Sequence, residues 1–360
     1  MSRKGAKCLK KTEKPSVALI FGGRGFEHDI SVRGAEYVFP LIDGSKYRKI
    51  PVYITKNGTW LTPMLRDLSV CPRAVIDEAV PTEECFPVYR NSVGGIETDT
   101  AFIPIISAFP LLHGDFGEDG VVQGALENAR IPYVGCDTQA SAVARDKGYV
   151  KLVAESLGIP TAKWVYVTGG HTEKSLSEAE EKIGYPAFVK PARLGSSFGT
   201  GVAGCRAELE SAVASALSVG SGKALIEEYV EVEKELECGY FGTKSKELFT
   251  GVGEISYKLG FYDYEAKYFS SSATVSSDAS ITEDESETIR DYSSRLTNLL
   301  GLSGLSRIDF FRARDGKIYF NEINTMPGFT ESSLYPRLVS GMGISPWELV
   351  NLLIEDASGI

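Results

Sequence analysis

The sequence carries, at residues 306–311 and 318–324, the stretches SRIDFF and IYFNEIN. Both alternate polar and apolar residues, which is the pattern of a half-buried β-strand. Asp315-Gly316 lies between them, and this dipeptide is a strong signal for a two-residue hairpin turn. A turn at those two residues would pair Arg314 with Lys317. The two stretches are therefore predicted to form an antiparallel hairpin.

The predicted register brings two carboxylates face to face. Asp309 lies opposite Glu322, and Arg307 lies opposite Asn324 two residues along the same face. Side chains directly opposite each other are about 5 Å apart, and two like charges there destabilise a sheet, so the pair needs a cation. Oxygen ligands suit Mg²⁺, which takes one or two carboxylates together with substrate phosphates. The pattern therefore indicates either a nucleotide–magnesium site or a solvated acidic hairpin with a three-residue loop and a different register.

Length, charge and cysteine content limit the class of protein. A chain of 360 residues exceeds one typical core, which predicts two or three domains. A net charge of −10 argues against general affinity for nucleic acid or membranes. The six cysteines form no C-x-x-C pair, which is typical of reduced thiols in a cytoplasmic protein. The basic segment at 1–15 is expected to be a tail, because the apolar run Val17–Phe21 after it is too short for a signal peptide.

Strands alternate with helices in the first part of the chain. The continuous apolar run Val17–Phe21 is typical of a parallel strand buried on both faces. Helical sequence at 30–41 and further strands at 50–54 and 102–107 predict a parallel α/β sheet that ends near Gly135. Residues 62–100 contain several prolines and are expected to be irregular.

Two further units are expected after the first. One helix is predicted over 138–157, followed by a small α+β lobe that ends with a strand at 224–228. The remainder contains the hairpin and a terminal helix. The expected boundaries are 1–136, 137–229 and 230–360, in a mixed α/β and α+β protein.

Several segments outside the hairpin carry chemistry. Lys190 ends a strand before the loop GSSFG at 195–199, where small residues let backbone N–H groups approach an anion. A surface turn is the alternative, as a solvated helix face is for Lys147. Glu27 at a helix start could hold an ammonium group or cap the helix. His113 ends a strand at the edge where ligands bind in parallel sheets, although a structural histidine is equally compatible.

Taken together, the motifs resemble those of the D-alanine–D-alanine ligases, a family of the ATP-grasp superfamily. The resemblance covers most of the chain in order and is carried by FGGRGFEHDIS (21–31), LHGDFGEDGVVQG (112–124), PYVGC (132–136), VKPARLGSSFG (189–199), YDYEAKY (262–268), RIDFF (307–311) and FNEINTMPGFTESSLYP (320–336). It implies an ATP-grasp fold with an N-terminal parallel α/β, or preATP-grasp, domain. ATP would lie between the central and C-terminal lobes.

The resemblance also implies a role for individual residues. The first D-alanine would be bound by Glu27 with His113 nearby, the second by Ser333 and Leu334. The residues implied to bind ATP are Lys147, Lys190, Ser197, Glu227, Tyr229, Val230, Glu235 and Lys267. Those implied to bind two Mg²⁺ or Mn²⁺ ions are Asp309, Glu322 and Asn324. Those implied in catalysis are Glu27 linked to Ser196 and Tyr268, with Arg307 and Gly328 holding the oxyanion.

The implied reaction has two steps. The carboxylate of the first D-alanine attacks the γ-phosphate of ATP and gives an acyl phosphate. The amine of a second D-amino acid then attacks that carbonyl group, and phosphate leaves. A cytoplasmic homodimer that supplies peptidoglycan precursor is the family expectation.

The second substrate admits an alternative, a D-alanine–D-serine ligase. The segments at 134–142 and 192–199 are similar to the vancomycin-resistance ligases, which join D-alanine to D-lactate or D-serine. Tyr268 argues against D-lactate, because the E-A-K-Y lid is associated with amino-acid acceptors. Leu334 argues against D-serine, because resistance ligases often carry Arg at that position and an apolar side chain suits a methyl group. An apolar pocket rejects an added hydroxyl only weakly, so D-serine remains the alternative.

Two more distant alternatives are a catalytically silent ATP-binding protein and an ATP-grasp ligase with another acceptor. Retention of the metal ligands and of Arg307 argues against the first. The YDYEAKY segment argues against the second.

Overall fold

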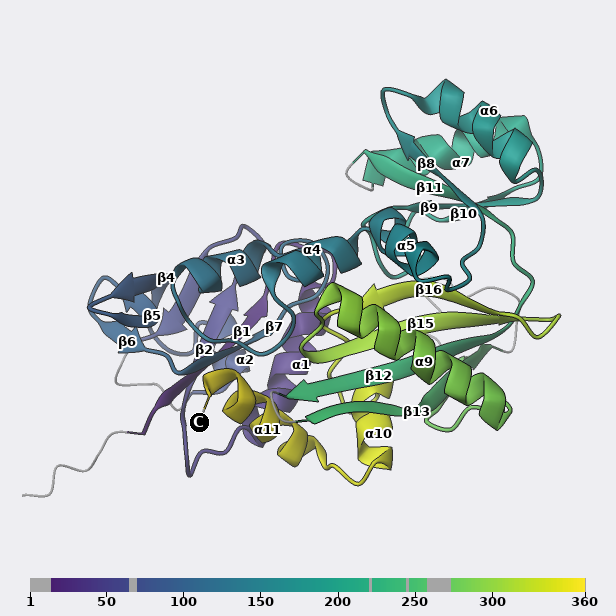
Figure 1. Ribbon diagram of the computed structural model, residues 1–360. Helices are drawn as coiled ribbons and strands as arrows, with labels where there is room; N and C mark the ends of the chain where they lie inside the picture. The colour runs from purple at the N-terminus through teal and green to yellow at the C-terminus, as the bar shows by residue number, and fades with distance from the viewer. Residues whose placement is uncertain (1–13, 65–69, 220–221, 244–245, 258–272, 360) are drawn as a thin grey trace, which may run out of the picture.

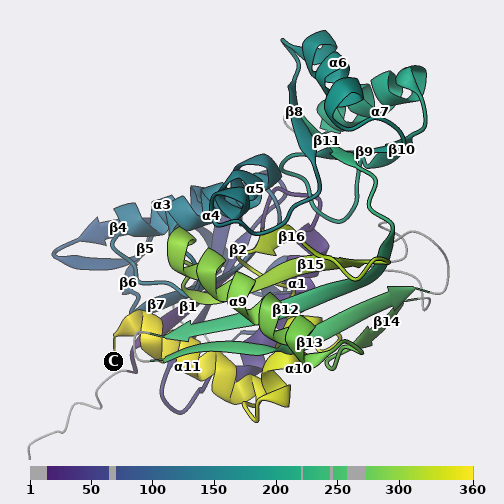
Figure 2. The same ribbon diagram turned by 45° about the vertical axis from the view of Figure 1, so that its right-hand side comes forward.

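The computed structural model describes residues 14–64, 70–219, 222–243, 246–257 and 273–359. These residues form three β-sheets of seven, four and five strands, each with its own helices (Figure 1). No helix in this part of the chain is long and apolar enough to cross a membrane. The four-stranded sheet stands away from the other two and is joined to them near α5 (Figure 2).

The N-terminal sheet has a parallel centre, as the apolar run predicted. β1 (Ser16–Gly22) is buried along its whole length and pairs in parallel with β2 (Arg48–Ile54) and β7 (Ser107–Leu111). The helices α1 (His28–Leu41) and α3 (Val121–Asn128) pack against this part of the sheet. A strand with no exposed face needs apolar residues at every position, which is why this one was predictable.

The prediction that residues 62–100 are irregular was wrong. They contain an antiparallel extension of the sheet, with order β6-β5-β4-β3. Its elements are β3 (Trp60–Pro63), α2 (Pro72–Ile76), β4 (Thr82–Arg90), β5 (Val93–Thr98) and β6 (Phe102–Pro104). β4 is largely exposed, so its sequence lacks the apolar pattern of a buried strand and tolerates a proline. The single strand predicted at 102–107 is divided between β6 and β7.

The single helix predicted over 138–157 is two helices. α4 (Thr138–Arg145) ends at Asp146, and α5 (Lys147–Ser156) begins directly after it. The Asp146 carboxylate accepts hydrogen bonds from the backbone N–H groups of Gly148 and Tyr149 and so caps α5. An aspartate satisfies the free N–H groups of a new helix better than it continues an old one. The break brings Lys147 to the first turn of α5.

The small lobe is a four-stranded sheet of order β10-β9-β11-β8. Its elements are β8 (Trp164–Thr168), α6 (Thr172–Lys182), β9 (Ala187–Pro191), β10 (Gly201–Ala203), α7 (Arg206–Val219) and β11 (Lys223–Glu228). Both helices pack on the same side of the sheet and close one apolar core with it. The loop between β9 and β10 faces the five-stranded sheet.

The five-stranded sheet has order β14-β13-β12-β15-β16. Its elements are β12 (Val232–Thr243), β13 (Lys246–Tyr257), β14 (Ala273–Ser276), α9 (Glu283–Leu300), β15 (Gly304–Ala313), β16 (Ile318–Asn324), α10 (Leu334–Gly341) and α11 (Pro346–Ser358). α5 and α9 share an apolar core with one face of the sheet. α10 and α11 share another core with β1, β7 and α1, so the first and last parts of the chain are packed together.

The hairpin of β15 and β16 has the predicted carboxylate pair but not the predicted turn. Asp309 pairs with Glu322, as expected. The turn, however, has three residues, because Ala313 donates its N–H to Lys317 O at 2.9 Å. The pairing of Arg314 with Lys317 was therefore wrong. A β-bulge at Asn321 compensates for the extra turn residue and restores the register before Glu322 is reached.

Asp146 holds more than a helix start, which predicts an unusually large effect of its removal. It is fully buried and also accepts hydrogen bonds from Tyr166 Oη at 2.9 Å and Arg193 Nε at 2.9 Å. Asp146→Ala should lower the free energy of unfolding by about 2–4 kcal/mol, because one buried and three partly buried hydrogen bonds lose their acceptor. Asp137→Ala is the matched control, since Asp137 is an exposed cap with one bond, from Ala140, and should cost about 1 kcal/mol. Urea unfolding measures both, and equal losses would contradict the assignment.

Candidate active site

Two adjoining cavities lie where the three sheets meet. One has a volume of about 490 Å³ and lies between the N-terminal sheet and the five-stranded sheet. The other, of about 360 Å³, lies between the four-stranded and five-stranded sheets. The residues that line both are Lys147, Gly195, Ser196, Glu237, Ile255, Arg307 and Glu322. A ligand that fills one cavity therefore reaches the side chains that border the other.

The opposed carboxylates of the hairpin are each neutralised by a basic side chain. Arg307 donates from Nε and Nη2 to the two oxygens of Asp309, at 2.7 Å each. Lys147 Nζ lies 3.1 Å from Glu322 Oε2. Asn324 donates its amide N–H to Asp309 Oδ2 at 2.9 Å. The repulsion expected between Asp309 and Glu322 is thus offset by cations from one neighbouring and one distant position.

These donors fit a hard divalent cation. Asp309 and Glu322 present carboxylate oxygens from directly paired positions, and Asn324 adds an amide oxygen on the same face. Mg²⁺ favours such oxygen ligands and takes its remaining ligands from phosphates and water. The described residues contain no cluster of three or more His, Cys, Asp or Glu side chains of metal-binding geometry, so the hairpin set of two carboxylates and an amide depends on oxygens from a substrate.

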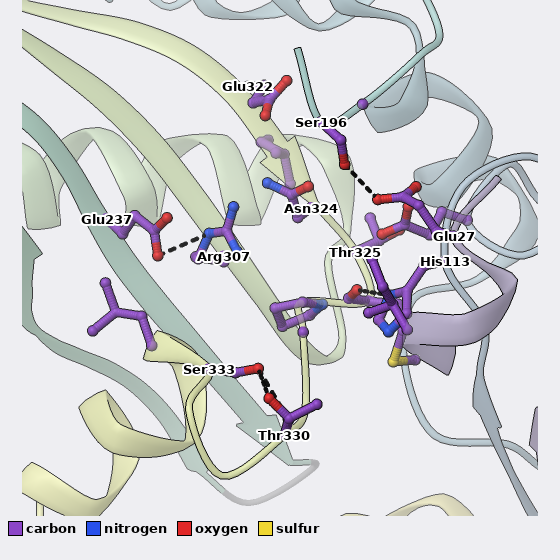
Figure 3. A pocket seen from close by; sticks show the side chains of 18 of the residues that line it. Glu27, His113, Ser196, Glu237, Arg307, Glu322, Asn324, Thr325, Thr330 and Ser333 are labelled. Atoms are coloured by element: carbon purple, nitrogen blue, oxygen red, sulfur yellow. Dashed lines mark hydrogen bonds and ion pairs between the residues drawn. The ribbon is translucent and has the colours of Figure 1, made fainter. Parts of the chain in front are cut away.

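Arg307 stays charged in its buried position. Burial alone would lower its pKa, but Asp309 and Glu237 beside it hold the pKa well above its ordinary value. Its Nε lies 3.1 Å from Glu237 Oε2 (Figure 3). A buried guanidinium between two carboxylates is a fixed positive charge at the border of the two cavities.

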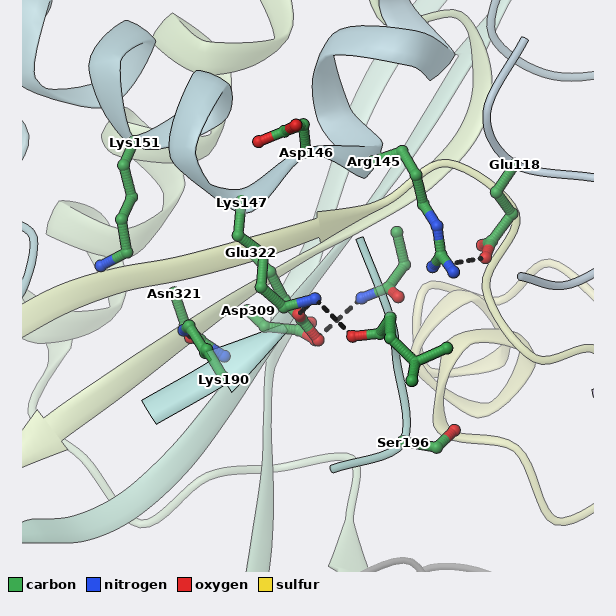
Figure 4. A network of polar contacts seen from close by, with 12 residues as sticks. Glu118, Arg145, Asp146, Lys147, Lys151, Lys190, Ser196, Asp309, Asn321 and Glu322 are labelled. Carbon is green, nitrogen blue, oxygen red and sulfur yellow. Dashed lines mark hydrogen bonds and ion pairs between the residues drawn. The ribbon is translucent and has the colours of Figure 1, made fainter. Parts of the chain in front are cut away.

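Lys147 points from the start of α5 into the same region. Its Nζ donates to Leu194 O at 2.9 Å as well as facing Glu322 (Figure 4). Burial lowers the pKa of Lys147, and Glu322 acts in the opposite direction. A desolvated ammonium group held by few partners is well placed to bind a phosphate anion.

A second pair of lysines surrounds Glu227. Lys190 Nζ lies 3.0 Å from one Glu227 oxygen and Lys151 Nζ 3.0 Å from the other. Lys190 also donates to Asn321 Oδ1 at 3.1 Å, which links the four-stranded sheet to the bulge of the hairpin. Burial would raise the pKa of Glu227, but the two lysines together lower it. Sequence reasoning missed Lys151, whose only signal was its position one turn after Lys147 on an apolar helix.

The other residues implied to bind a nucleotide line the smaller cavity. Ser197 borders it from the loop after β9, and Glu235 from β12. Tyr229 and Val230 follow β11 directly, where the backbone leaves the sheet. Apolar side chains complete the wall at Ala162, Phe188, Leu236 and Phe310. An apolar slot beside backbone that has left the sheet suits a flat heteroaromatic ring.

Glu27 and Ser196 join the first and second parts of the chain across the larger cavity. Ser196 Oγ donates to Glu27 Oε1 at 2.8 Å (Figure 3). A Cβ atom at Gly114, which has φ of +73°, would lie 2.8 Å from Glu27 Oε2, so a larger residue there would be strained and would displace this carboxylate. His113 lies beside them with Nδ1 3.1 Å from Met326 O and with a buried Nε2 that has no hydrogen-bond partner among the described residues. Glu27 and His113 both line the larger cavity.

A buried ion pair beneath this pocket was missed from the sequence. Arg145 Nη1 lies 3.6 Å from Glu118 Oε2 (Figure 4). Arg145 Nη2 lies 3.1 Å from Asp115 Oδ1. Burial raises the pKa of Glu118, which Arg145 counteracts. Glu118 also accepts the backbone N–H of Gly114 at 2.9 Å, so the pair holds the turn against which Glu27 lies.

The comparisons with known proteins agree on one family. The model of the D-ala D-ala ligase N-terminus matches residues 16–136, and that of the D-ala D-ala ligase C-terminus matches residues 153–355. The D-alanine–D-alanine ligase of Geobacillus thermodenitrificans is 39% identical over 349 residues, covering 95% of this chain and 94% of the relative. That of Acetivibrio thermocellus is 38% identical, covering 95% and 96%. The chain belongs to the D-alanine–D-alanine ligase family.

Solved structures of related ligases share the whole architecture. The VanG D-Ala:D-Ser ligase from Enterococcus faecalis superposes with a TM-score of 0.86 at 32% identity, covering 96% of this chain and 100% of that chain. The D-alanine–D-alanine ligase from Coxiella burnetii gives 0.83 at 27% identity, covering 96% and 94%. The predicted ATP-grasp fold with an N-terminal α/β part is confirmed.

In this D-alanine–D-alanine ligase family member, the wall expected to receive the second amino acid comes from the segment after β16. Ser333 begins α10, and its Oγ lies 2.8 Å from Thr330 Oγ1 (Figure 3). A Cβ at Gly328 would lie 3.0 Å from that Oγ, so the two positions are in close contact. Leu334 is buried and packs with Ile255 and Leu338.

Two of the predicted site residues, Lys267 and Tyr268, lie outside the described residues. The YDYEAKY segment that contains them at 262–268 likewise falls within the undescribed range 258–272. Glu331, in the motif at 320–336, lines the larger cavity. Burial raises the pKa of Tyr37, and the charge of Glu331 raises it further.

The lysine–glutamate arrangement predicts a specific acid sensitivity. Glu227→Gln should lower the free energy of unfolding by about 3–5 kcal/mol at neutral pH, because two buried lysines lose their counter-charge. Since the pKa of Glu227 is lowered on folding, its contribution is present above its ordinary value of 4.5 and is lost as the pH falls through the lowered value. Unfolding measured from pH 7 to 3 should therefore show a smaller acid-induced loss in Glu227→Gln than in the wild type.

Glu228→Gln is the matched control for that experiment. Glu228 is the next residue of β11, is partly exposed, and accepts one backbone hydrogen bond from Lys163 at 2.9 Å. We expect its effect to stay below about 1 kcal/mol. Equal destabilisation by the two substitutions, or an unchanged acid limb in Glu227→Gln, would contradict the role of the paired lysines.

Proposed function

We propose that this chain joins two D-alanine molecules into D-alanyl-D-alanine and cleaves ATP to ADP and phosphate. The observation that carries the proposal is the continuity of the two cavities. The nucleotide-type cavity, with its lysines, meets the Glu27 pocket at Arg307 and Glu322. An amino acid held at Glu27 would have its carboxylate near the phosphates of a nucleotide in the other cavity. Family membership supports the same reaction.

The nucleotide would be held between the parts 137–229 and 230–360, which we propose as the two ATP-grasp lobes. Tyr229 and Val230 would offer backbone groups to the adenine, and Glu235 would accept from the ribose hydroxyls. Lys147 and Lys190 would meet the phosphates together with the backbone of the loop at Ser197. Glu227, whose oxygens face Lys151 and Lys190, would act on the adenine side mainly by keeping these ammonium groups in place.

The metal requirement follows from the hairpin. Asp309, Glu322 and Asn324 would hold two Mg²⁺ or Mn²⁺ ions between themselves and the phosphates. Such ions offset the negative charge that develops during phosphoryl transfer. Arg307, which is bidentate on Asp309 in this structure, would then be free to turn toward the reacting carbonyl group.

The two chemical steps depend mainly on position and charge. Glu27 would bind the ammonium group of the first D-alanine, with Ser196 fixing the carboxylate of Glu27 and His113 lying beside it. The carboxylate of this D-alanine attacks the γ-phosphorus of ATP, the bond to the β–γ bridging oxygen breaks, and ADP leaves as the acyl phosphate forms. The amine of the second amino acid attacks that carbonyl carbon, and Arg307 and the Gly328 N–H would stabilise the oxyanion. Collapse of the tetrahedral intermediate releases phosphate and leaves the new amide bond.

D-Alanine is proposed as the second substrate. Leu334 presents an apolar side chain packed with Ile255 and Leu338, which complements a methyl group better than a hydroxymethyl group. D-Serine is the second candidate, because the VanG ligase, a D-Ala:D-Ser ligase, superposes closely on this chain. We further propose a cytoplasmic homodimer in which the N-terminal part supplies Glu27 and His113 to the larger cavity.

The products distinguish the two acceptors directly. With ATP, Mg²⁺ and D-alanine alone, the purified chain should release phosphate and form D-alanyl-D-alanine. Equimolar D-serine or D-lactate should leave that dipeptide as the main product, measured by mass spectrometry. A mixed product in excess would assign the chain to the resistance type. ATP binding without phosphate release in every mixture would contradict ligase activity altogether.

Neutral substitutions in the hairpin test the metal ligands. Asp309→Asn and Glu322→Gln should each reduce kcat at least about 10²-fold, because transition-state charge loses its fixed counter-ion. ATP binding measured without divalent cation should change much less. Asp315→Asn is the matched control, because Asp315 lies in the turn of the same hairpin and only accepts from Lys317 N at 3.0 Å. Full activity of Glu322→Gln would rule out its role as a ligand.

A further inference from the structure

Two exposed phenylalanines meet beside the contact between Glu27 and Ser196. Phe26 precedes Glu27 in the connection from β1 to α1, and Phe198 follows Ser196 by two residues in the loop after β9. Their rings stack, with centroids 5.6 Å apart and an interplanar angle of 29°. The side chains remain 73% and 45% exposed, so this contact does not serve a buried core. It joins two loops that belong to different sheets.

The loop that carries Phe198 needs such a contact. Ser196 and Ser197 both have left-handed backbone conformations, with φ of 58° and 57°. Two successive non-glycine residues in that region are strained and persist only when surrounding contacts hold them. Within the loop, Phe198 N donates to Gly195 O at 3.4 Å and Thr200 Oγ1 donates to Ser197 O at 2.9 Å. Contacts from outside therefore matter for its geometry.

The loop that carries Phe26 is itself fastened. The Arg24 guanidinium lies 4.4 Å from the centre of the Phe116 ring, in the loop after β7. A Cβ at Gly58 would lie 2.9 Å from the Arg24 side chain, which shows how closely Arg24 is packed on its other side. Cation–π contacts of this kind fix a side chain even where it is partly exposed. Phe26 is thus presented from a held loop to a strained one.

We propose that Phe26 and Phe198 form an aromatic clasp that keeps the 195–199 loop closed over the Glu27 pocket. The inference rests on the proposed function, because it assigns the pair to binding of the first D-alanine. Both are positioning residues: the clasp raises the fraction of molecules in which Ser196 already contacts Glu27. The apparent affinity for a ligand falls in proportion to the fraction of molecules with a competent site. Saturating substrate closes the loop by itself, so the chemical step depends little on the clasp.

Kinetics of three variants test the clasp. Phe26→Ala and Phe198→Ala should each raise the KM for the first D-alanine by about two- to tenfold, the range that aromatic pair energies imply, with kcat within about twofold of wild type. The double variant should be no worse than either single one, because the same contact is lost. Phe198→Tyr keeps the stacking and should restore the wild-type KM. Additive losses, or an unchanged KM, would overturn the proposal.

Hydrogen exchange gives a readout that does not depend on activity. Without substrate, amides of residues 194–200 should exchange faster in Phe26→Ala than in the wild type, although the substitution is in another sheet's loop. Phe86→Ala is the matched control, since Phe86 is 57% exposed on β4, and should change neither exchange nor KM. Unchanged exchange in Phe26→Ala would overturn the clasp. If the wild-type protein makes no dipeptide but exchange is still faster in Phe26→Ala, the proposed function is refuted and the clasp is retained.

Discussion

Mutual repulsion between two carboxylates is the constraint around which the site is built. Asp309 and Glu322 face each other on paired strands of a partly buried sheet, where like charges are unfavourable. Arg307 offsets the first, and Lys147 offsets the second from a helix more than 150 residues earlier in the chain. The same negative pair that must be neutralised for folding is what would attract metal ions with a nucleotide.

Neutralisation of these groups connects the sheets. Lys190 reaches from the small lobe to Asn321 at the bulge and to Glu227, which Lys151 of α5 also contacts. Asp146 interrupts the preceding helix and so allows Lys147 to begin a new one at the cavity. Buried charges are unfavourable unless paired, and the contacts of Lys147 with Glu322, Lys151 with Glu227 and Lys190 with Asn321 join elements that are far apart in sequence. The charged contacts that link the sheets are therefore the same ones that set the charge of the site.

The part of the site proposed to bind the first amino acid is organised by a second set of contacts. Ser196 and Glu27 meet across the larger cavity, and the turn behind Glu27 is held by Glu118 and Arg145. The aromatic contact nearby is at the surface, where it acts on a strained loop instead of on the core. A charged wall facing a strained loop is an arrangement that suits a site that must admit substrate and then exclude water.

Local sequence pattern alone was sufficient to predict part of the fold and of the candidate site. The buried strand at 17–21 and the pairing of Asp309 with Glu322 follow from apolar runs and from alternation over a few residues. The pairing was correct although its turn was not, because the bulge at Asn321 cancelled a one-residue error that no short pattern reveals. The strand β4 was missed because a largely exposed strand with an internal proline lacks the apolar pattern of a buried strand.

The sequence by itself determined the family, the buried strand at 17–21 and the pairing of Asp309 with Glu322, because these depend on residue types at fixed local spacing. Only the tertiary structure decided the partners of the charged groups. Lys151 pairs with Glu227 and Arg145 with Glu118, and Phe26 stacks on Phe198, across long stretches of chain. Burial and pairing are properties of the folded neighbourhood, and the chain order of two residues says nothing about whether they share one.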